Sequence, residues 1–415
     1  MEYGLIGEKL THSFSKEIHA QLFDYKYELC EIPKDRLDAF MRARDFKAIN
    51  VTIPYKQAVI PYLDEISDAA RDIGALNTIV NRGGKLYGDN TDFLGLSALI
   101  KRTGVELSGK KVYILGSGGT SKTATAVAKS LGAAEVNRVS RSGRDGCITY
   151  EAAQGEDIEV IINTTPCGMY PKIGYTPIDI TPFKNLCGVI DAVYNPLSSA
   201  LVCTAKAYGI PAAGGLYMLV AQAAFAAEKF TGESVAPEKI EKIYRKMLIS
   251  KRNIVLIGMP ASGKTTVGTI LSKNLGMPLI DTDSEICKFT GRAIPEIFAE
   301  SGEAGFRDIE AQIIKEVSAR QGVIISTGGG AILRRENTEL LRENGRIYFL
   351  DRPLELLITT DDRPLSSNRA DLEKRYNERY DIYCDSADIK IDGAATPEIC
   401  ADRIKEDFFN EDTCN

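Results

Sequence analysis

Two glycine-rich loops constrain the fold of this chain more than any other feature, because each directly follows a short apolar run. The run at 111–115 leads into Gly116-Ser117-Gly118-Gly119, and the run at 253–257 leads into Gly258-x₄-Gly263-Lys264-Thr265. A strand, a glycine turn and a helix in this order hold phosphate groups at the N-terminus of the helix. The sequence therefore predicts two α/β sheets, each with its own phosphate site.

The composition removes several functional classes. The 415 residues exceed what one core usually serves, so we expect two or three domains. The net charge of -6, without a basic block, argues against nucleic acid as a partner. No apolar run approaches the length of a membrane span. The only histidines are His12 and His19, which excludes a zinc site built from histidines and a transition-metal enzyme.

Cysteine usage indicates the compartment. The nine cysteines are scattered without a C-x-x-C pair, and the N-terminus shows no leader pattern. Unpaired thiols of this kind are typical of a reducing environment. We therefore expect a cytoplasmic protein without disulfides.

Strand and helix patterns alternate along the chain, which favours an α/β fold with largely parallel sheets. In the first part we expect a strand at 48–52, a helix after Pro54 through Leu63, and a hairpin-like pair at 75–80 and 86–88. A helix beginning at Pro237 leads to a short junction without a flexible tether. The remaining strands are expected at 111–115, 136–140, 158–162 and 187–191, and at 253–257, 323–327, 346–350 and 387–391.

The first loop has the form used for a dinucleotide pyrophosphate, although glycine-rich turns are common in any α/β sheet. The strand after it ends in Ser140-Arg141-Ser142, where an NAD site usually has an acidic residue for the ribose diol. An arginine there favours a 2′-phosphate and hence NADP. The alternative is a solvated arginine in a turn.

Polar residues upstream of this loop suit a small polyhydroxylated ligand. Lys56 and Asp92 form the one credible pair for proton transfer among them. Each residue alone has an ordinary explanation, since serines before a helix are often caps and a lysine after proline is often solvated. The hydroxyl and amide side chains of the set are Ser13, Ser15, Asn50, Thr52 and Asn77.

Together these segments resemble the shikimate dehydrogenase family over residues 1–248. The motifs that carry the resemblance are Ser13-Phe14-Ser15, Asn50-Val51-Thr52-Ile53-Pro54-Tyr55-Lys56, Gly74-Ala75-Leu76-Asn77-Thr78, Gly88-Asp89-Asn90-Thr91-Asp92, Gly116-Ser117-Gly118-Gly119, Asn163-Thr164-Thr165-Pro166-Cys167-Gly168-Met169, Asp191-Ala192-Val193-Tyr194-Asn195-Pro196 and Gly215-Leu216-Tyr217-Met218-Leu219-Val220-Ala221-Gln222. The resemblance implies reversible, NADPH-dependent reduction of 3-dehydroshikimate to shikimate, with Lys56 and Asp92 as the catalytic pair.

The same resemblance implies two sets of binding residues. The substrate would be held by Ser13, Ser15, Asn50, Thr52, Lys56, Asn77, Asp92, Tyr194 and Gln222. NADP would be held by Gly116, Ser117, Gly118, Gly119, Thr120, Ser140, Arg141, Thr164, Gly215 and Met218.

The second loop is a stronger signal, because its spacing is that of a nucleoside triphosphate site. Backbone N–H groups surround the phosphates, Lys264 reaches the β and γ oxygens, and the Thr265 hydroxyl binds Mg²⁺. A predicted strand then delivers Asp281 and Asp283, carboxylates suited to a metal and to a substrate hydroxyl. Arginines further on offer forked donors for phosphate or carboxylate, although each alone could be a surface ion-pair partner. They are Arg307, Arg363 and Arg379.

Residues 251–415 resemble the shikimate kinase family. The motifs are Asp281-Thr282-Asp283, Thr290-Gly291-Arg292, Ile297-Phe298-Ala299-Glu300, Gly302-Glu303 with Phe306-Arg307 and Glu310, and Gly328-Gly329-Gly330. The family transfers the γ-phosphoryl group of ATP to the 3-hydroxyl of shikimate, mainly by positioning and charge neutralisation. The resemblance implies that Lys264 and Asp283 are catalytic and that Thr265 and Asp281 bind the metal. ATP would be bound by Gly258, Ala261, Ser262, Gly263, Lys264, Thr265, Thr266 and a lid residue, Arg363. Shikimate would be bound by Asp283, Arg307, Gly329, Gly330 and Arg379.

The two resemblances predict a bifunctional enzyme of consecutive steps that uses NADP(H), ATP and Mg²⁺. The expected domains are 1–92 with 222–248 for 3-dehydroshikimate, a Rossmann-type domain at 93–221 for NADP, and a P-loop kinase domain at 251–415. The expected partners are small-molecule substrates, with the chain a monomer or homodimer. The alternatives are a quinate/shikimate dehydrogenase with NAD preference, and a fusion in which one module only senses its ligand.

Overall fold

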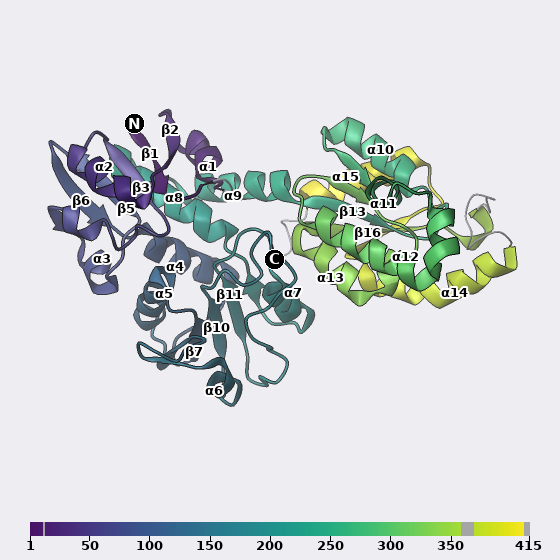
Figure 1. Cartoon of the computed structure of the whole chain (residues 1–415), viewed down its shortest axis with the longest axis horizontal. Helices are drawn as coiled ribbons and strands as arrows, with labels where there is room; N and C mark the ends of the chain where they lie inside the picture. The colour runs from purple at the N-terminus through teal and green to yellow at the C-terminus, as the bar shows by residue number, and fades with distance from the viewer. Residues whose placement is uncertain (11–12, 358–368, 411–415) are drawn as a thin grey trace. The chain divides into compact units, whose positions relative to one another are not determined.

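The computed structural model describes residues 1–10, 13–357 and 369–410. It divides into two compact units (Figure 1). The first comprises Met1–Met169 with Tyr175–Met247, and the second comprises Tyr170–Gly174 with Leu248–Asn415. Among the described residues, no helix is both long and apolar enough to cross a membrane.

The first sheet of the first unit has the strand order β2-β1-β3-β5-β6-β4. β1 pairs in parallel with β2 and β3, whereas β5 and β6 form the predicted antiparallel hairpin. One face buries a core that includes Ile6, Ile49, Leu76 and Ile79. The elements of this region are β1 (Tyr3–Gly7), α1 (Ser15–Leu22), β2 (Tyr27–Glu31), η1 (Lys34–Arg36), α2 (Leu37–Ala43), β3 (Ala48–Val51), η2 (Ile60–Tyr62), β4 (Glu65–Ile66), α3 (Asp68–Ile73), β5 (Thr78–Arg82) and β6 (Lys85–Asp89).

The helix expected after Pro54 is wrong. The chain there makes successive turns and only the short 3₁₀-helix η2. Pro61 lies within the expected helix, and a proline has no N–H and clashes with the carbonyl four residues earlier. The turns leave Lys56 on a loop at the end of β3, beside the sheet edge where the site forms.

The second sheet is the predicted doubly wound sheet, with the strand order β12-β11-β10-β7-β8-β9 and only parallel pairs. Its central strand β7 is buried on both faces: Val112 and Ile114 face the core with α4 and α5, whereas Tyr113 and Leu115 face the core with α6 and α7. The elements are α4 (Thr91–Thr103), β7 (Lys111–Leu115), α5 (Gly119–Ser130), β8 (Glu135–Val139), β9 (Cys147–Ile148), α6 (Tyr150–Gln154), β10 (Val160–Asn163), β11 (Gly188–Asp191), α7 (Ala200–Ala207) and β12 (Ala212–Ala213).

Two helices join the halves of this unit. α4 packs closely along α8 (Leu216–Thr231), and a Cβ built at Gly95 would lie 2.7 Å from the Met218 carbonyl oxygen. A glycine is therefore required at this crossing because the two backbones approach too closely for a side chain. The predicted helix from Pro237 is α9 (Pro237–Lys251), which buries Ile240 and Ile243.

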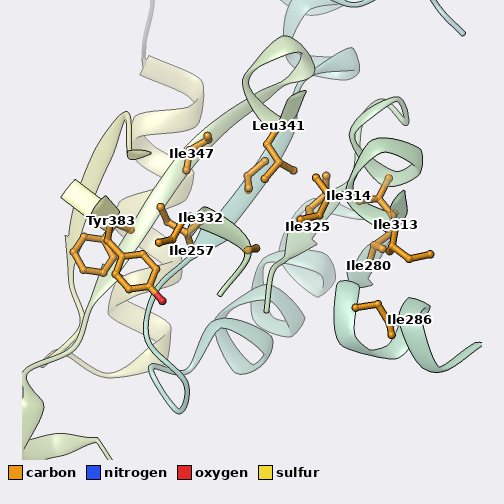
Figure 2. Packing of buried hydrophobic residues seen from close by; sticks show 14 of the residues in the cluster. Ile257, Ile280, Ile286, Ile313, Ile314, Ile325, Ile332, Leu341, Ile347 and Tyr383 are labelled. Carbon is orange, nitrogen blue, oxygen red and sulfur yellow. The ribbon is translucent and has the colours of Figure 1, made fainter. Parts of the chain in front are cut away.

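The second unit holds one parallel sheet with the strand order β14-β15-β13-β16-β17. Val255 and Ile257 of β13 face one core, shown in part in Figure 2, and Ile254 and Leu256 face the other. This alternation is how a central parallel strand is buried on both sides. The elements are β13 (Asn253–Ile257), α10 (Lys264–Leu275), β14 (Leu279–Asp281), α11 (Thr282–Thr290), α12 (Ile294–Ser318), β15 (Ile324–Ser326), η3 (Ala331–Leu333), α13 (Arg335–Asn344), β16 (Gly345–Asp351), η4 (Leu354–Leu356), α14 (Arg369–Ser386), β17 (Ile389–Asp392) and α15 (Pro397–Asn410).

Candidate active sites

The centre of the first site is an ion pair between Lys56 and Asp92. The Lys56 Nζ donates to Asp92 Oδ2 over 2.5 Å, and the side chains are only 18% and 11% exposed. Asp92 lies in the first turn of α4, whose N-cap Asn90 accepts a hydrogen bond from the Phe93 N–H. The helix start therefore fixes the carboxylate, and the turn after β3 brings the ammonium to it.

Asn77 connects this pair to a distant part of the chain. Its Nδ2 donates to Asp92 Oδ1 over 2.9 Å and to Gln222 Oε1 over 3.1 Å. Its Oδ1 accepts from the Thr91 N–H over 2.7 Å, which fixes the orientation of the amide. Four predicted substrate residues, Lys56, Asn77, Asp92 and Gln222, are thus brought together, although Asn77 and Gln222 alone are 145 residues apart in the chain.

Asn50 is a predicted substrate residue whose amide is already engaged by the protein. Its Oδ1 accepts from the Tyr27 hydroxyl over 2.8 Å, and its Nδ2 donates to the Asn77 carbonyl and to Thr78 Oγ1. Tyr27 therefore supports this side of the site, and sequence reasoning missed it. No local pattern identifies Tyr27 as a residue of the site, because its hydrogen-bond partner Asn50 lies 23 residues away in the chain.

The remaining predicted substrate residues lie on loops or, for Ser15, at the first position of α1. Ser13 Oγ donates to Ser15 Oγ over 3.1 Å, and Ser15 is buried at the start of α1. Tyr194 packs its ring against Phe14 at a centroid distance of 5.3 Å, and burial raises the pKa of Tyr194. Thr52 directly follows β3, where its N–H donates to the Ile6 carbonyl.

The predicted NADP loop has the backbone geometry of a phosphate cradle. Gly116 has φ 120°, and a Cβ there would lie 2.6 Å from Thr164 Oγ1. A Cβ at Gly118 would meet nothing within 4 Å, and α5 begins at Gly119. The turn therefore has open space in front of a helix N-terminus, which fits a pyrophosphate.

The other predicted NADP residues lie at the carboxyl edge of the same sheet, where open α/β sheets bind their ligands. Ser140 and Arg141 follow β8, with Ser140 buried and Arg141 exposed. Thr164 follows β10 and donates to the Leu115 carbonyl over 2.7 Å. Ser117 and Thr120 follow the end of β7, and Gly215 and Met218 follow the end of β12.

Asp191 links two strand ends beneath this edge, and it was absent from the predicted site. It is fully buried and accepts from Asn163 Nδ2 over 2.9 Å, from Ser199 Oγ over 2.5 Å and from the Val193 N–H over 2.9 Å. Burial raises its pKa to about 6, against the opposing effect of these three donors.

In the second unit, the loop after β13 adopts a strained turn before α10. Gly258 and Gly263 have φ 150° and 92°, and Ala261 has φ 64°. The Lys264 Nζ donates to the Gly258 and Met259 carbonyls, each over 2.9 Å. The lysine is thus held over the loop, where it can neutralise bound phosphate.

The predicted metal residues are adjacent. Thr265 Oγ1 donates to Asp281 Oδ2 over 2.9 Å and lies 3.3 Å from Ser326 Oγ. These are hard oxygen donors beside a phosphate loop, which fits Mg²⁺.

A cavity of about 540 Å³ joins the phosphate loop to the ends of β14 and β15. The predicted residues that line it are Ala261, Gly263, Lys264, Thr265, Thr266, Asp281, Asp283, Arg307, Gly329, Gly330 and Arg379. Gly258 and Ser262 belong to the loop but do not line the cavity, and Arg363 lies outside the described residues. Sequence reasoning missed an apolar wall of Ile294, Phe298 and Phe306, and an additional cation, Arg375.

Two charged side chains of the cavity wall form an ion pair. Arg307 Nη1 donates to Glu310 Oε2 over 2.7 Å, and both side chains are buried. Burial raises the pKa of Glu310, and the Arg307 guanidinium opposes that shift. A Cβ at Gly328 would lie 2.7 Å from Asp283 Oδ1 and 2.9 Å from Glu310 Oε1, so the glycine leaves room for both carboxylates where they lie. The result is a site with both signs of charge around an apolar wall, suited to a small ring acid.

Two family models match separate parts of the chain. The one described as shikimate dehydrogenase substrate binding domain matches residues 5–79. The one described as shikimate kinase matches residues 260–408.

Curated relatives cover the first unit. The shikimate dehydrogenase (NADP(+)) of Clostridium beijerinckii is 39% identical over 243 residues, which is 54% of this chain and 90% of the relative. The enzyme of the same name from Geobacillus kaustophilus is 36% identical over 255 residues, which is 56% of this chain and 92% of the relative.

Solved structures match the same region. A chorismate mutase/shikimate 5-dehydrogenase fusion protein from Clostridium acetobutylicum is 35% identical with a TM-score of 0.56, covering 59% of this chain and 96% of that chain. Shikimate 5-dehydrogenase from Thermus thermophilus in complex with NADP(H) and shikimate is 27% identical with a TM-score of 0.54, covering 59% of this chain and 99% of that chain.

Proposed function

Because the chain belongs to the shikimate dehydrogenase family and carries a shikimate kinase domain, we propose that it catalyses two consecutive reactions. The first is NADPH-dependent reduction of 3-dehydroshikimate to shikimate, and the second is ATP-dependent phosphorylation of shikimate to shikimate 3-phosphate. NADPH supplies the hydride and ATP-Mg²⁺ the phosphoryl group. The observation that carries this proposal is that each unit combines a glycine-rich phosphate loop with a polar site that suits a small acid.

In the first site, Lys56 donates a proton to the substrate oxygen as the carbonyl becomes a hydroxyl. Asp92 holds the ammonium 2.5 Å away and keeps it aimed, while Asn77 holds the other oxygen of Asp92. The low exposure of the pair limits competition from water. Gln222 and the serines at 13 and 15 bind the ring hydroxyls and carboxylate.

In the second site, Asp283 accepts a hydrogen bond from the attacking hydroxyl of shikimate. Arg307 and Arg379 bind the substrate carboxylate from the cavity wall. Lys264 and the loop N–H groups neutralise charge on the phosphates, so catalysis comes from positioning in a shielded site. Phe298 and Phe306, stacked at 4.6 Å, cover the apolar edge of the ring.

The test supplies 3-dehydroshikimate, NADPH and ATP-Mg²⁺ to the purified chain and detects products by mass spectrometry. We expect shikimate 3-phosphate, NADPH oxidation that continues without ATP, and phosphorylation of added shikimate without NADPH. Binding of a ligand without turnover in either half would support the sensor alternative and overturn the proposal. Rates with NADPH and NADH on shikimate and quinate decide cofactor preference.

We further propose three functional domains: 1–92 with 222–248 for 3-dehydroshikimate, 93–221 for NADP and 251–415 for phosphorylation. The change of sheet between β6 and β7 and the chain crossing at α4 and α8 support the first two. We also propose that the chain works in the cytoplasm on small molecules alone, as a monomer or homodimer. No disulfide joins the cysteines among the described residues, which supports a reducing compartment.

A further inference from the structure

Tyr383 belongs to none of the motifs that the proposed function uses, yet its hydroxyl reaches the second site. The residue is 1% exposed, and its ring stacks on Phe349 of β16 at a centroid distance of 5.0 Å and an interplanar angle of 10°. Figure 2 shows the ring among the packed residues of the core. The hydroxyl donates to the carbonyl of Gly329, which lines the cavity.

The Gly329 carbonyl receives two donors from the same helix, α14. Besides the Tyr383 hydroxyl, Arg379 Nη1 donates to it over 3.1 Å. The cis peptide bonds among the described residues all precede prolines, so the bond from Gly329 to Gly330 is trans. In a trans peptide the C=O and the next N–H point in opposite directions. Fixing the Gly329 carbonyl against α14 therefore fixes the direction of the Gly330 N–H, away from those donors.

The Gly330 N–H is a buried donor on the cavity wall. Among the described residues, no group accepts a hydrogen bond from this N–H. Buried peptide N–H groups are nearly always paired, so this one is suited to an oxygen of a bound ligand. A Cβ at Gly330 would overlap the guanidinium of Arg307, so the N–H and that cation belong to one wall.

We propose that Tyr383 is a positioning residue of the kinase site, which holds the Gly329 carbonyl and thereby aims the Gly330 N–H at an oxygen of shikimate. This rests on the proposed kinase function. Arg379 cannot hold the peptide alone, because the same guanidinium is proposed to bind the substrate carboxylate. When Arg379 turns toward that carboxylate, the Tyr383 hydroxyl remains as the group that keeps the peptide in place.

Replacing Tyr383 with Phe removes the hydroxyl and keeps the stacked ring. We expect the KM for shikimate to rise about tenfold, the worth of one well-placed hydrogen bond. The KM for ATP and the kcat should stay within about twofold, because the hydroxyl that is removed donates to the Gly329 carbonyl and not to the phosphate loop. Calorimetric titration of shikimate into each protein should show the same loss of affinity.

Tyr380→Phe is the matched control. Tyr380 lies one turn away on α14, its ring contacts Phe349 at 5.9 Å, and its hydroxyl donates to Asp351 Oδ2 over 3.0 Å instead of to the glycine loop. This variant should keep the wild-type KM for shikimate.

The proposal fails if Tyr383→Phe keeps the wild-type KM for shikimate. It also fails if the KM for both substrates rises together, or if Tyr380→Phe has the same effect. If Tyr383→Phe does not fold, the proposal fails as well, because the hydroxyl then acts on stability alone. A wild-type chain that does not phosphorylate shikimate would refute the proposed function instead, so the two failures are distinguishable.

Discussion

Replacing Lys56 with Met should remove the reductase activity and leave the kinase activity intact. Methionine keeps the apolar stem of the side chain and deletes the ammonium that lies 2.5 Å from Asp92 Oδ2. General acid catalysis by a positioned side chain contributes about 10² to 10⁴ in rate. Since Lys56 and Asp92 are only 18% and 11% exposed, water can replace the proton donor only poorly. We therefore expect kcat to fall toward the upper end of that range.

The assay follows NADPH absorbance with 3-dehydroshikimate, and separately ADP release with shikimate and ATP-Mg²⁺. Lys47→Met is the control, because Lys47 is an exposed lysine in the same unit whose ion-pair partner is Glu2, at 2.9 Å. The control should keep both activities within about twofold. The Lys56 variant should keep the melting temperature of the wild type and its kinase rate.

Two outcomes would refute this reasoning. A reductase kcat within about tenfold of the wild type would mean that Lys56 is not the proton donor. Loss of both activities in a folded Lys56→Met protein would mean that the two sites do not act separately.

Three further predictions concern other parts of the chain. Lys264→Ala should abolish ATP-dependent phosphorylation and leave NADPH oxidation unchanged, as the two assays above would show. Gly330→Ala should raise the KM for shikimate at least about tenfold, because its Cβ overlaps the Arg307 guanidinium; an unchanged KM would contradict the close approach. Asp191 has its pKa raised by burial from 3.8 to about 6, so its contribution to stability is full below pH 4 and is lost as the pH rises through 6. Relative to Asp191→Asn, the wild type should therefore lose about 3 kcal/mol between pH 4 and pH 8 in urea unfolding, and a constant difference would exclude this titration.

Local patterns predicted much of the fold. The doubly wound sheet, the hairpin of β5 and β6 and the helix from Pro237 follow from apolar periodicity and turn residues, and the structure contains them. The helix expected after Pro54 does not form, because Pro61 interrupts it. The edge strand β2 was not predicted, because its alternation of half-buried and exposed residues carries little apolar signal.

The sequence by itself determined which chemistry-bearing residues the chain has and which loops have the form of a phosphate site, because glycine turns, lysines and paired carboxylates are recognised by their local spacing. Only the tertiary structure decided which groups support them. The Asn77 amide meets Gln222 across 145 residues, and the Tyr383 hydroxyl meets the Gly329 carbonyl across 54. Such contacts depend on which strands are neighbours and where a helix packs, and no local pattern encodes the partner of a hydrogen bond.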